Sequence, residues 1–281
     1  MPGTLYVVAT PIGNLEDVTL RALRVLREVS VIAAEDTRRT ARLLQHYSIS
    51  TRTTSLHEHN EHTRTPALVA RLLAGESVAL VSDAGTPLIS DPGRQLVSAA
   101  HAAGIRVEPV PGASAVLAAL SAAGLPGEGF LFVGFPPHRS NAKMEWFKAL
   151  AAEKRVVVLY EAPHRFLDTL RTMTDVLGER QICVARELTK KHEELVVRPI
   201  SAFIESPPPA RGEFTIVIGS RQADPEVDLA CLEAQVPRVF DEMTKNNQVS
   251  RRTAVQEVAK QLNLPANRVY RLLLDRDDSA E

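Results

Sequence analysis

Along the first 125 residues, short apolar runs alternate with segments in which apolar residues recur at helical spacing. The helical spacing is clear at Leu20, Leu23 and Leu26, which share one face of a helix. Nearly continuous apolar strands separated by helices are typical of a parallel sheet covered on both faces. The apolar runs predict strands at Leu5–Ala9, Ser30–Ala34, Val78–Ser82 and Arg106–Val110, and the helical segments lie near 20–29, 66–74, 92–103 and 112–123.

A cluster of glycine and proline at 124–129 interrupts this pattern and predicts a domain boundary. The pattern then restarts, and adjacent strands late in this block leave no room for helices between them, which predicts antiparallel pairs in a mixed sheet. The expected strands are Phe130–Gly134, Arg155–Tyr160, Ile182–Arg186, Leu195–Arg198 and Phe214–Ile218, with helices near 141–152 and 163–177.

From about Asp224 onward no strand pattern remains, and helices are expected near 227–245, 251–261 and 266–274. The fold class predicted is therefore α/β, with two α/β domains and a small helical appendage. Their expected bounds are 1–124, 125–223 and 224–281.

Composition places the chain among ordinary globular proteins, with 44% hydrophobic residues in a total of 281. Its 33 Lys and Arg nearly balance 34 Asp and Glu, which argues against nucleic-acid binding through an overall positive field but leaves local basic patches open. Cys183 and Cys231 are too few for a disulfide framework. Since the start lacks a signal-peptide pattern and no apolar run approaches eighteen residues, we expect a cytoplasmic protein without a membrane partner.

Three loops that contain glycine follow predicted strands of the first block, at 10–15, 82–87 and 109–115. Each loop alone is compatible with an ordinary strand-to-helix turn. Together, with Ser90–Gly93 close behind the second, they favour a ligand site at the carboxyl ends of the strands. Fingerprints of dinucleotide binding, of phosphate-binding loops and of serine-hydrolase elbows are absent from the sequence.

Two polar clusters could carry other chemistry. The run from His57 to His62 lacks the histidine four residues after His57 that a metalloprotease helix needs, so we expect a polar loop and no metal. The run Glu35–Arg39 has two interpretations. Asp36 or Thr37 caps a helix, or the charges face a substrate, in which case Arg38, Arg39 and Arg42 suit a phosphate backbone.

Eight segments, in order, resemble the tetrapyrrole methylase superfamily of S-adenosylmethionine-dependent methyltransferases, over about residues 4–220. They resemble most the branch that methylates the ribose 2′-hydroxyl of a cytidine in 16S ribosomal RNA of the small ribosomal subunit. The segments are Leu5–Leu15, Ala34–Arg38, Ser82–Gly93, Pro111–Ala115, Gly134–Pro137, Tyr160–Arg165, Ala185–Thr189 and Gly212–Phe214.

The resemblance implies two α/β domains with S-adenosylmethionine between them, and a homodimer. In the first domain it implies a wall of the cofactor site at Pro11, Ile12 and Gly13. The loop of Asp83, Ala84 and Gly85 would approach the methionyl part, followed by Ser114 and Ala115. The adenosine side would be closed from the second domain by Tyr160, Ala185, Gly212 and Glu213.

Methyl transfer from a sulfonium needs no metal, but a ribose hydroxyl is a weak nucleophile that a general base would assist. Asp36, Glu35 and Glu187 follow strands and are candidates, of which we select Glu187 and Asp36 as catalytic residues. The alternative, that Arg186 and Glu187 form a structural ion pair, stays open.

Local positive charge is concentrated between Arg238 and Arg276, where eight Lys or Arg stand against four Asp or Glu. The helices there have a helix-turn-helix outline, and the alternative is a solvated helical cap. Beside an RNA methylase core we favour RNA contact, together with the basic loop 137–143. The RNA-binding residues expected are Arg38, Arg39, Arg139, Lys143, Arg251, Arg252, Arg268 and Arg271.

Two rival functions remain from the sequence. A precorrin or porphyrin C-methyltransferase would share the fold but would not need the basic appendage. A non-enzymatic nucleic-acid-binding regulator would use the C-terminal helices but would leave the glycine loops unexplained.

Overall fold

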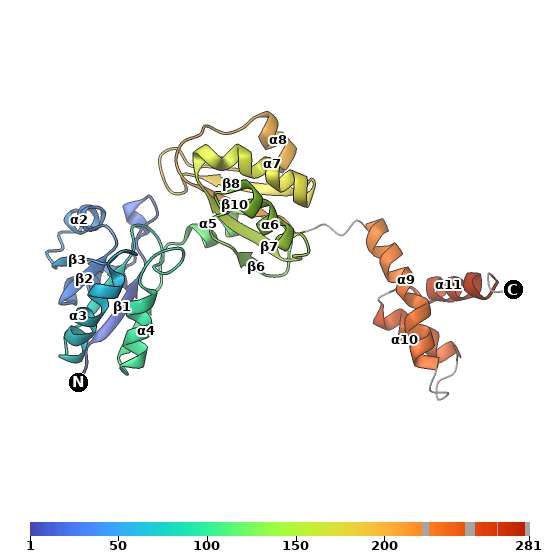
Figure 1. Ribbon diagram of the computed structural model, residues 1–281, viewed down its shortest axis with the longest axis horizontal. Coiled ribbons are helices and arrows are strands. Elements are labelled where there is room, and N and C mark those ends of the chain that lie inside the picture. Colours follow the sequence, from blue (N-terminus) through green and yellow to red (C-terminus); the bar gives the residue numbers. More distant parts are fainter. Residues whose placement is uncertain (221–224, 245–250, 263, 279–281) are drawn as a thin grey trace. The chain divides into compact units, whose positions relative to one another are not determined.

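A computed structural model describes residues 1–220, 225–244, 251–262 and 264–278 (Figure 1). The chain separates into two compact units, Met1–Arg221 and Gln222–Glu281. The first unit contains two five-stranded sheets, and the described part of the second contains helices. The predicted fold class, α/β with a helical C-terminal region, is confirmed. The domain bounds at 124 and 223 stay predictions.

The first sheet is entirely parallel, in the order β3-β2-β4-β1-β5. Its buried side chains form one cluster with α1 and α2 and another with α3 and α4, so helices cover both faces as the apolar runs predict. Its strands are β1 Thr4–Val8, β2 Val31–Ala34, β3 Thr53–Ser55, β4 Val78–Val81 and β5 Arg106–Val110. Its helices are η1 Leu15–Asp17, α1 Leu20–Glu28, α2 Thr37–His46, α3 Glu61–Leu73 and α4 Arg94–Ala102.

The second sheet is mixed, in the order β6-β7-β10-β8-β9, with β6 parallel to β7 and every other pair antiparallel. The prediction of late antiparallel pairs is thus confirmed. Its strands are β6 Phe130–Phe132, β7 Val156–Glu161, β8 Gln181–Arg186, β9 Glu194–Pro199 and β10 Phe214–Ile218. Its helices are α6 Ser140–Leu150, η2 Pro163–Arg165, α7 Phe166–Leu177 and α8 Ile200–Glu205.

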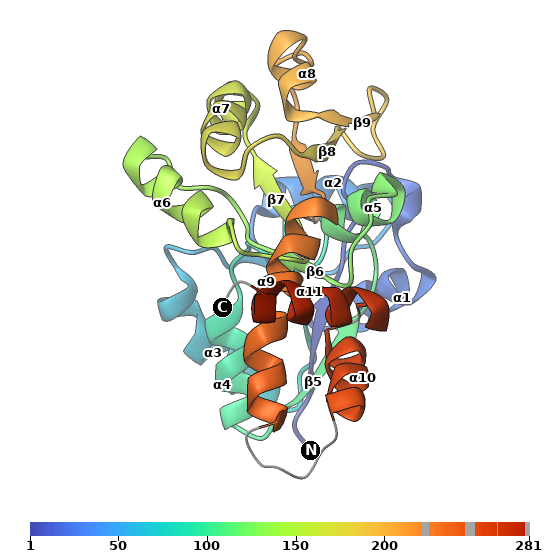
Figure 2. The ribbon, with the colours of Figure 1, turned by 90° about the vertical axis from the view of Figure 1, so that its right-hand side faces the viewer.

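Helix α5, Ala115–Ala123, precedes the expected boundary at 124–125 yet packs on the second sheet. Its Val116, Ala119 and Ala123 are buried against residues of β7, β8 and β10. Helices α6, α7 and α8 cover the opposite face of that sheet (Figure 2). The loop after β5 therefore leads from the first sheet directly to α5 on the second sheet. This connection brings loops of both sheets to one site.

The C-terminal unit consists, in its described part, of α9 Pro225–Thr244, α10 Arg251–Gln261 and α11 Ala266–Asp278. Apolar residues from all three helices form one small core, which includes Val236, Val258 and Val269. No helix among the described residues has the length and apolar character needed to cross a bilayer.

Lys143 contradicts the interpretation of 137–143 as a basic loop that contacts RNA. It lies in the first turn of α6, only 1% of its surface is exposed, and its Nζ donates to Asp168 Oδ2 on α7 at 2.5 Å. Asp168 itself is 67% exposed. Lys143 thus joins two helices and is not available to a phosphate backbone, so the prediction for this residue is wrong.

The buried ammonium generates a stability prediction. Asp168→Asn leaves Lys143 without a charged partner and should lower the free energy of unfolding by about 1–3 kcal/mol. Lys143→Met removes the buried charge at similar length and should leave stability at or above that of the parent. Urea unfolding measures both.

Lys148→Met is the matched control, because Lys148 lies on the same helix in an exposed pair with Glu145. This variant should change stability by less than about 0.5 kcal/mol. A loss in Lys143→Met as large as that in Asp168→Asn would contradict the account.

Candidate active site

The loops after β1 and β4 are fastened to each other through their backbones. Thr10 N donates to Gly85 O at 2.9 Å, and Gly85 N donates to Thr10 O at 3.0 Å. Gly85 has a φ of 81°, and a Cβ there would lie 3.3 Å from Ile12 Cγ2, so this position favours glycine. Because β1 and β4 are parallel neighbours, the pair lies at the carboxyl edge of the first sheet, where α/β proteins bind ligands.

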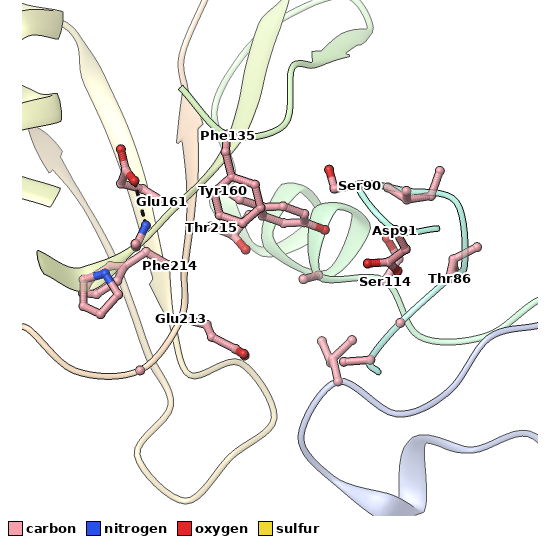
Figure 3. A pocket seen from close by; sticks show the side chains of 18 residues that line it. Thr86, Ser90, Asp91, Ser114, Phe135, Tyr160, Glu161, Glu213, Phe214 and Thr215 are labelled. Atoms are coloured by element: carbon pink, nitrogen blue, oxygen red, sulfur yellow. Dashed lines mark hydrogen bonds between the residues drawn. The ribbon is translucent and has the colours of Figure 1, made fainter. Parts of the chain in front are cut away.

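On one side of this backbone pair is a cavity of about 340 Å³, called the cleft below (Figure 3). Both sheets contribute to it: loops of the first sheet and the start of α5 form one side, and loops around β6, β7 and β10 form the other. The cleft is lined by Ile12, Ala84, Gly85, Thr86, Ile89, Ser90, Asp91, Ser114, Ala115, Phe135, Tyr160, Glu161, Ala162, Pro163, Gly212, Glu213, Phe214 and Thr215.

The cleft lining is acidic and carries no cation. Asp91, Glu161 and Glu213 are its charged residues, and none of the eighteen lining residues is Lys, Arg or His. Glu161 is already engaged, because its buried carboxylate accepts from the Thr169 hydroxyl and pairs with Arg165. Glu213 is engaged as well, because Lys190 Nζ donates to its Oε2 at 2.8 Å. Asp91 therefore contributes most to the negative character of the cleft.

Asp91 has the most perturbed carboxyl of the cleft. Burial, and then the negative charges of Glu35 and Asp83, raise its pKa to about 6, against a lowering hydrogen bond from Ser82. Burial together with the charges of Asp91 and Glu213 raises the pKa of Tyr160 to about 12. At neutral pH, Asp91 is thus a carboxylate that can accept a proton, while Tyr160 keeps its hydroxyl hydrogen.

On the other side of the Thr10–Gly85 pair is a second cavity of about 360 Å³, called the arginine recess below. Arg39 and Arg42 come to it from α2, and the exposed Arg39 also pairs with Asp83 at 3.3 Å. Its lining residues are Thr10, Pro11, Leu15, Arg39, Thr40, Arg42, Leu43, Ser82 and Asp83. The same two loops therefore separate a cation-free cavity from a cationic one.

Most residues that the sequence assigns to the cofactor lie at the cleft, although their role there stays a prediction. Those that line it are Ile12, Ala84, Gly85, Ser114, Ala115, Tyr160, Gly212 and Glu213. Pro11 and Asp83 line the arginine recess instead, and Ala185 lines a small hollow that also includes Ile12, Ala115 and Glu213. Gly13 lines neither cavity; a Cβ there would lie 2.5 Å from Lys190 Cγ, so its role in the structure is close packing.

Neither residue selected as a general base lines the cleft. Asp36 caps α2, as the first of the two interpretations predicts, and accepts from the backbone and guanidinium of Arg38, which hold its pKa well below the usual range. Glu187 accepts from Lys190 Nζ at 2.8 Å and from Glu213 N at 3.1 Å, and the lysine lowers its pKa. Both geometries argue against proton acceptance at neutral pH.

Asp91, Ile89 and Phe135 are residues of the cleft that the sequence does not single out. The motif Ser90–Gly93 after the β4 loop and the segment Gly134–Pro137 contain or adjoin them, so their segments are recognised but not their side chains. The sequence does not tell which distant loops desolvate Asp91, nor that Ile89 and Phe135 stay exposed in the folded chain.

The remaining predicted RNA-binding residues lie outside the cleft. Arg38, Arg39 and Arg139 are exposed on the first unit. In the second unit Arg271 is exposed, while Arg268 Nε donates to Glu233 at 2.6 Å. The side chains of Arg251 and Arg252 lie outside the described residues. Among the residues that the structure describes, no cluster of three or more His, Cys, Asp or Glu is placed to hold a metal ion.

Comparisons with known proteins find similar sequences and similar folds. Residues 4–203 match the family of tetrapyrrole (corrin/porphyrin) methylases. A protein of Synechocystis sp., named ribosomal RNA small subunit methyltransferase I, is 45% identical over 97% of this chain and 98% of its own length. A protein of the same name from Pseudomonas aeruginosa is 49% identical over 85% of this chain and 86% of its own.

Solved structures share the fold at low identity. Diphthine synthase aligns with a TM-score of 0.62 at 15% identity, over 77% of this chain and 90% of its own. The uroporphyrin-III C-methyltransferase of Thermus thermophilus, solved with S-adenosyl homocysteine, aligns with a TM-score of 0.56 at 20% identity, over 77% of this chain and 97% of its own. At these identities the likeness establishes the fold alone.

Proposed function

The chain belongs to the tetrapyrrole methylase family, and we propose that it transfers the methyl group of S-adenosylmethionine to the ribose 2′-hydroxyl of a cytidine in 16S ribosomal RNA. It is an enzyme, a methyltransferase. The observation that carries the RNA substrate is the identity of 45–49%, over 85% or more of each chain, to proteins named ribosomal RNA small subunit methyltransferase I. The acceptor is accordingly the small ribosomal subunit.

The cleft suits the cofactor. S-adenosylmethionine carries two positive groups, a sulfonium and an ammonium, and the Asp91 carboxylate, in a lining without Lys, Arg or His, favours a cation. The close backbone at Gly85 and the apolar walls of Ile12 and Ala115 suit its methionyl chain and ribose. When bound, the cofactor supplies a methyl group on a sulfur that leaves as a neutral thioether.

Asp91 is the proton acceptor of this proposal, in place of Asp36 and Glu187. The ribose oxygen forms a bond to the methyl carbon, the carbon–sulfur bond breaks with its electrons on sulfur, and the hydroxyl proton passes to the Asp91 carboxylate. The raised pKa matches this task, because a base works best when its pKa lies near the operating pH. The chain's main contribution is to hold hydroxyl and methyl in line.

The arginine recess is the proposed contact for the RNA backbone. Arg39 and Arg42 present guanidinium groups beside the loop that also borders the cleft, so a phosphate held there would keep its nucleotide near Asp91. Arg38 and Arg139, together with Arg251, Arg252, Arg268 and Arg271 of the helical unit, remain proposed outer contacts. A homodimer and a cytoplasmic location also belong to this proposal.

A transfer assay tests the function against its rivals. The full-length protein is incubated with methyl-labelled S-adenosylmethionine and either small ribosomal subunits or tetrapyrrole precursors. Label in the 16S RNA is expected. Label in the tetrapyrrole alone would contradict the RNA substrate, and binding of RNA without transfer to any acceptor would favour a non-enzymatic regulator.

A second prediction concerns Asp91 as the base. Asp91→Asn should lower kcat by about 10²–10⁴-fold, because the amide cannot accept the proton. In the parent, kcat should fall as the pH drops through a value at or below about 6, since the bound cation lowers the raised pKa of Asp91; the variant should lack this limb. Single-turnover rates across pH 5–9 measure both.

Asp175→Asn is the control, because Asp175 is exposed on α7 and lines neither cavity. It should behave as the parent does. If Asp91→Asn keeps the parent's kcat and loses only cofactor affinity, Asp91 anchors the cofactor and is not the base.

A further inference from the structure

Two large apolar side chains are exposed at the cleft. Ile89 is 42% exposed and Phe135 is 54% exposed. Among the described residues, they are the exposed large apolar side chains that line the cleft. Ile89 comes from the loop after β4 and Phe135 from the loop after β6, so they belong to opposite sheets. We call this pair the apolar rim.

The backbone around Ile89 is strained. Its neighbours Leu88 and Ser90 both have left-handed backbones, with φ of 71° and 68°, which branched or bulky residues adopt at a cost. Such conformations persist where the surrounding structure enforces them, and they gather at functional sites. Here they hold Ile89 toward solvent, next to Ser90 and Asp91 of the cleft lining.

The backbone around Phe135 is fixed from both sides. Tyr160 N donates to Gly134 O at 2.9 Å, and Arg165 Nη2 donates to Pro136 O at 2.6 Å and Pro137 O at 3.0 Å. Arg165 is in turn held by the buried Glu161, at 3.3 Å. The exposed ring is therefore preorganised rather than carried on a loose loop.

The two loops of the apolar rim meet. A Cβ on Gly134 would lie 3.5 Å from Ser90 Oγ. The Phe135 ring also lies against Tyr160, with centroids 5.4 Å apart, and leaves its other surroundings open. In Figure 3, Phe135 and Tyr160 lie between Phe214 on one side and Ser90 and Asp91 on the other.

From these observations we infer that the apolar rim is a binding site for one nucleotide base, the pyrimidine whose ribose is methylated. This inference rests on the proposed function. An aromatic ring and an aliphatic side chain on opposing loops suit a planar base, which proteins hold by stacking when it is unpaired or turned out of a helix. Ile89 is two residues from Asp91, so a base at the rim brings its own 2′-hydroxyl toward that carboxylate.

The alternative occupant is the adenine of the cofactor. The cleft offers adenine a different end, where Phe214 lies on the far side of Tyr160 from Asp91 (Figure 3). Ala162 and Pro163 are further apolar residues of the cleft lining. Phe214 at that end is buried, whereas both side chains of the apolar rim are exposed. The charge distribution agrees, because the rim adjoins the loop that leads past Gly85 to the arginine recess.

The test separates RNA binding from cofactor binding. Phe135→Leu keeps an apolar side chain but removes the stacking ring, and should raise KM for small subunits about tenfold or more. The Kd for S-adenosylmethionine, measured by calorimetry, should stay within about twofold of the parent's. Phe135→Tyr should keep the parent's KM, because a phenol ring also stacks on a base. Ile89→Ser should raise KM as Phe135→Leu does.

Phe130→Leu is the matched control, because Phe130 is also an exposed phenylalanine, at 40%, but lies in β6 and does not line the cleft. It should leave KM and Kd unchanged. A tenfold rise in cofactor Kd in Phe135→Leu without a change in KM would overturn the inference in favour of adenine. Parent-like values of both would overturn it outright, whereas a parent enzyme that does not methylate RNA would refute the proposed function instead.

Discussion

The paired backbones of Thr10 and Gly85 are the interaction on which the site depends. Two hydrogen bonds join the loops that leave neighbouring parallel strands, and they form the wall between two cavities. One cavity has carboxylates and no cation, and the other has two arginines. Without this wall, Asp91 would face the guanidinium groups of Arg39 and Arg42, as Asp83 of the arginine recess already does, and the negative cleft would be neutralised.

Separation of charge also explains how a nearly neutral chain can handle ligands of opposite sign. The formal net charge of −1 averages an acidic cleft with a recess that contains two arginines, which we propose for a sulfonium and for a phosphate backbone. The cleft carries energetic costs in return: a desolvated carboxylate at Asp91, left-handed backbones beside Ile89 and an exposed ring at Phe135. Several features that are unfavourable for folding, found together in one place, are typical of a functional site.

The sequence predicts those features of the site that depend on neighbours in the chain. Apolar runs between helices identify the parallel sheet, and the glycine loops after its strands include Ile12, Gly85 and Ser114 of the cleft. The sequence pattern does not predict the short polar strand β3, because three half-buried residues at a sheet edge show no periodic pattern.

The prediction for Lys143 is wrong, and the geometry argues against Glu187 as a base, because contacts in the folded chain decide the state of both side chains. Lys143 is buried by packing and by Asp168, 25 residues away, and Glu187 is held by Lys190 and Glu213. Asp36, by contrast, follows its local role as a helix cap, which the sequence offers as one of two interpretations. The pKa of Asp91 is raised by burial among segments far apart in the chain, and then by the charges of Glu35 and Asp83. Desolvation, which sets the chemistry of a carboxylate, is the property least visible in a sequence.

The most direct measurement is the identity of the methylated nucleoside. The RNA of small subunits methylated by the purified protein is digested to nucleosides. These are separated by chromatography and identified by mass spectrometry. A cleft that brings a ribose hydroxyl to Asp91 predicts 2′-O-methylcytidine as the product. A cytidine methylated on its base, or a methylated nucleoside other than cytidine, would contradict the account.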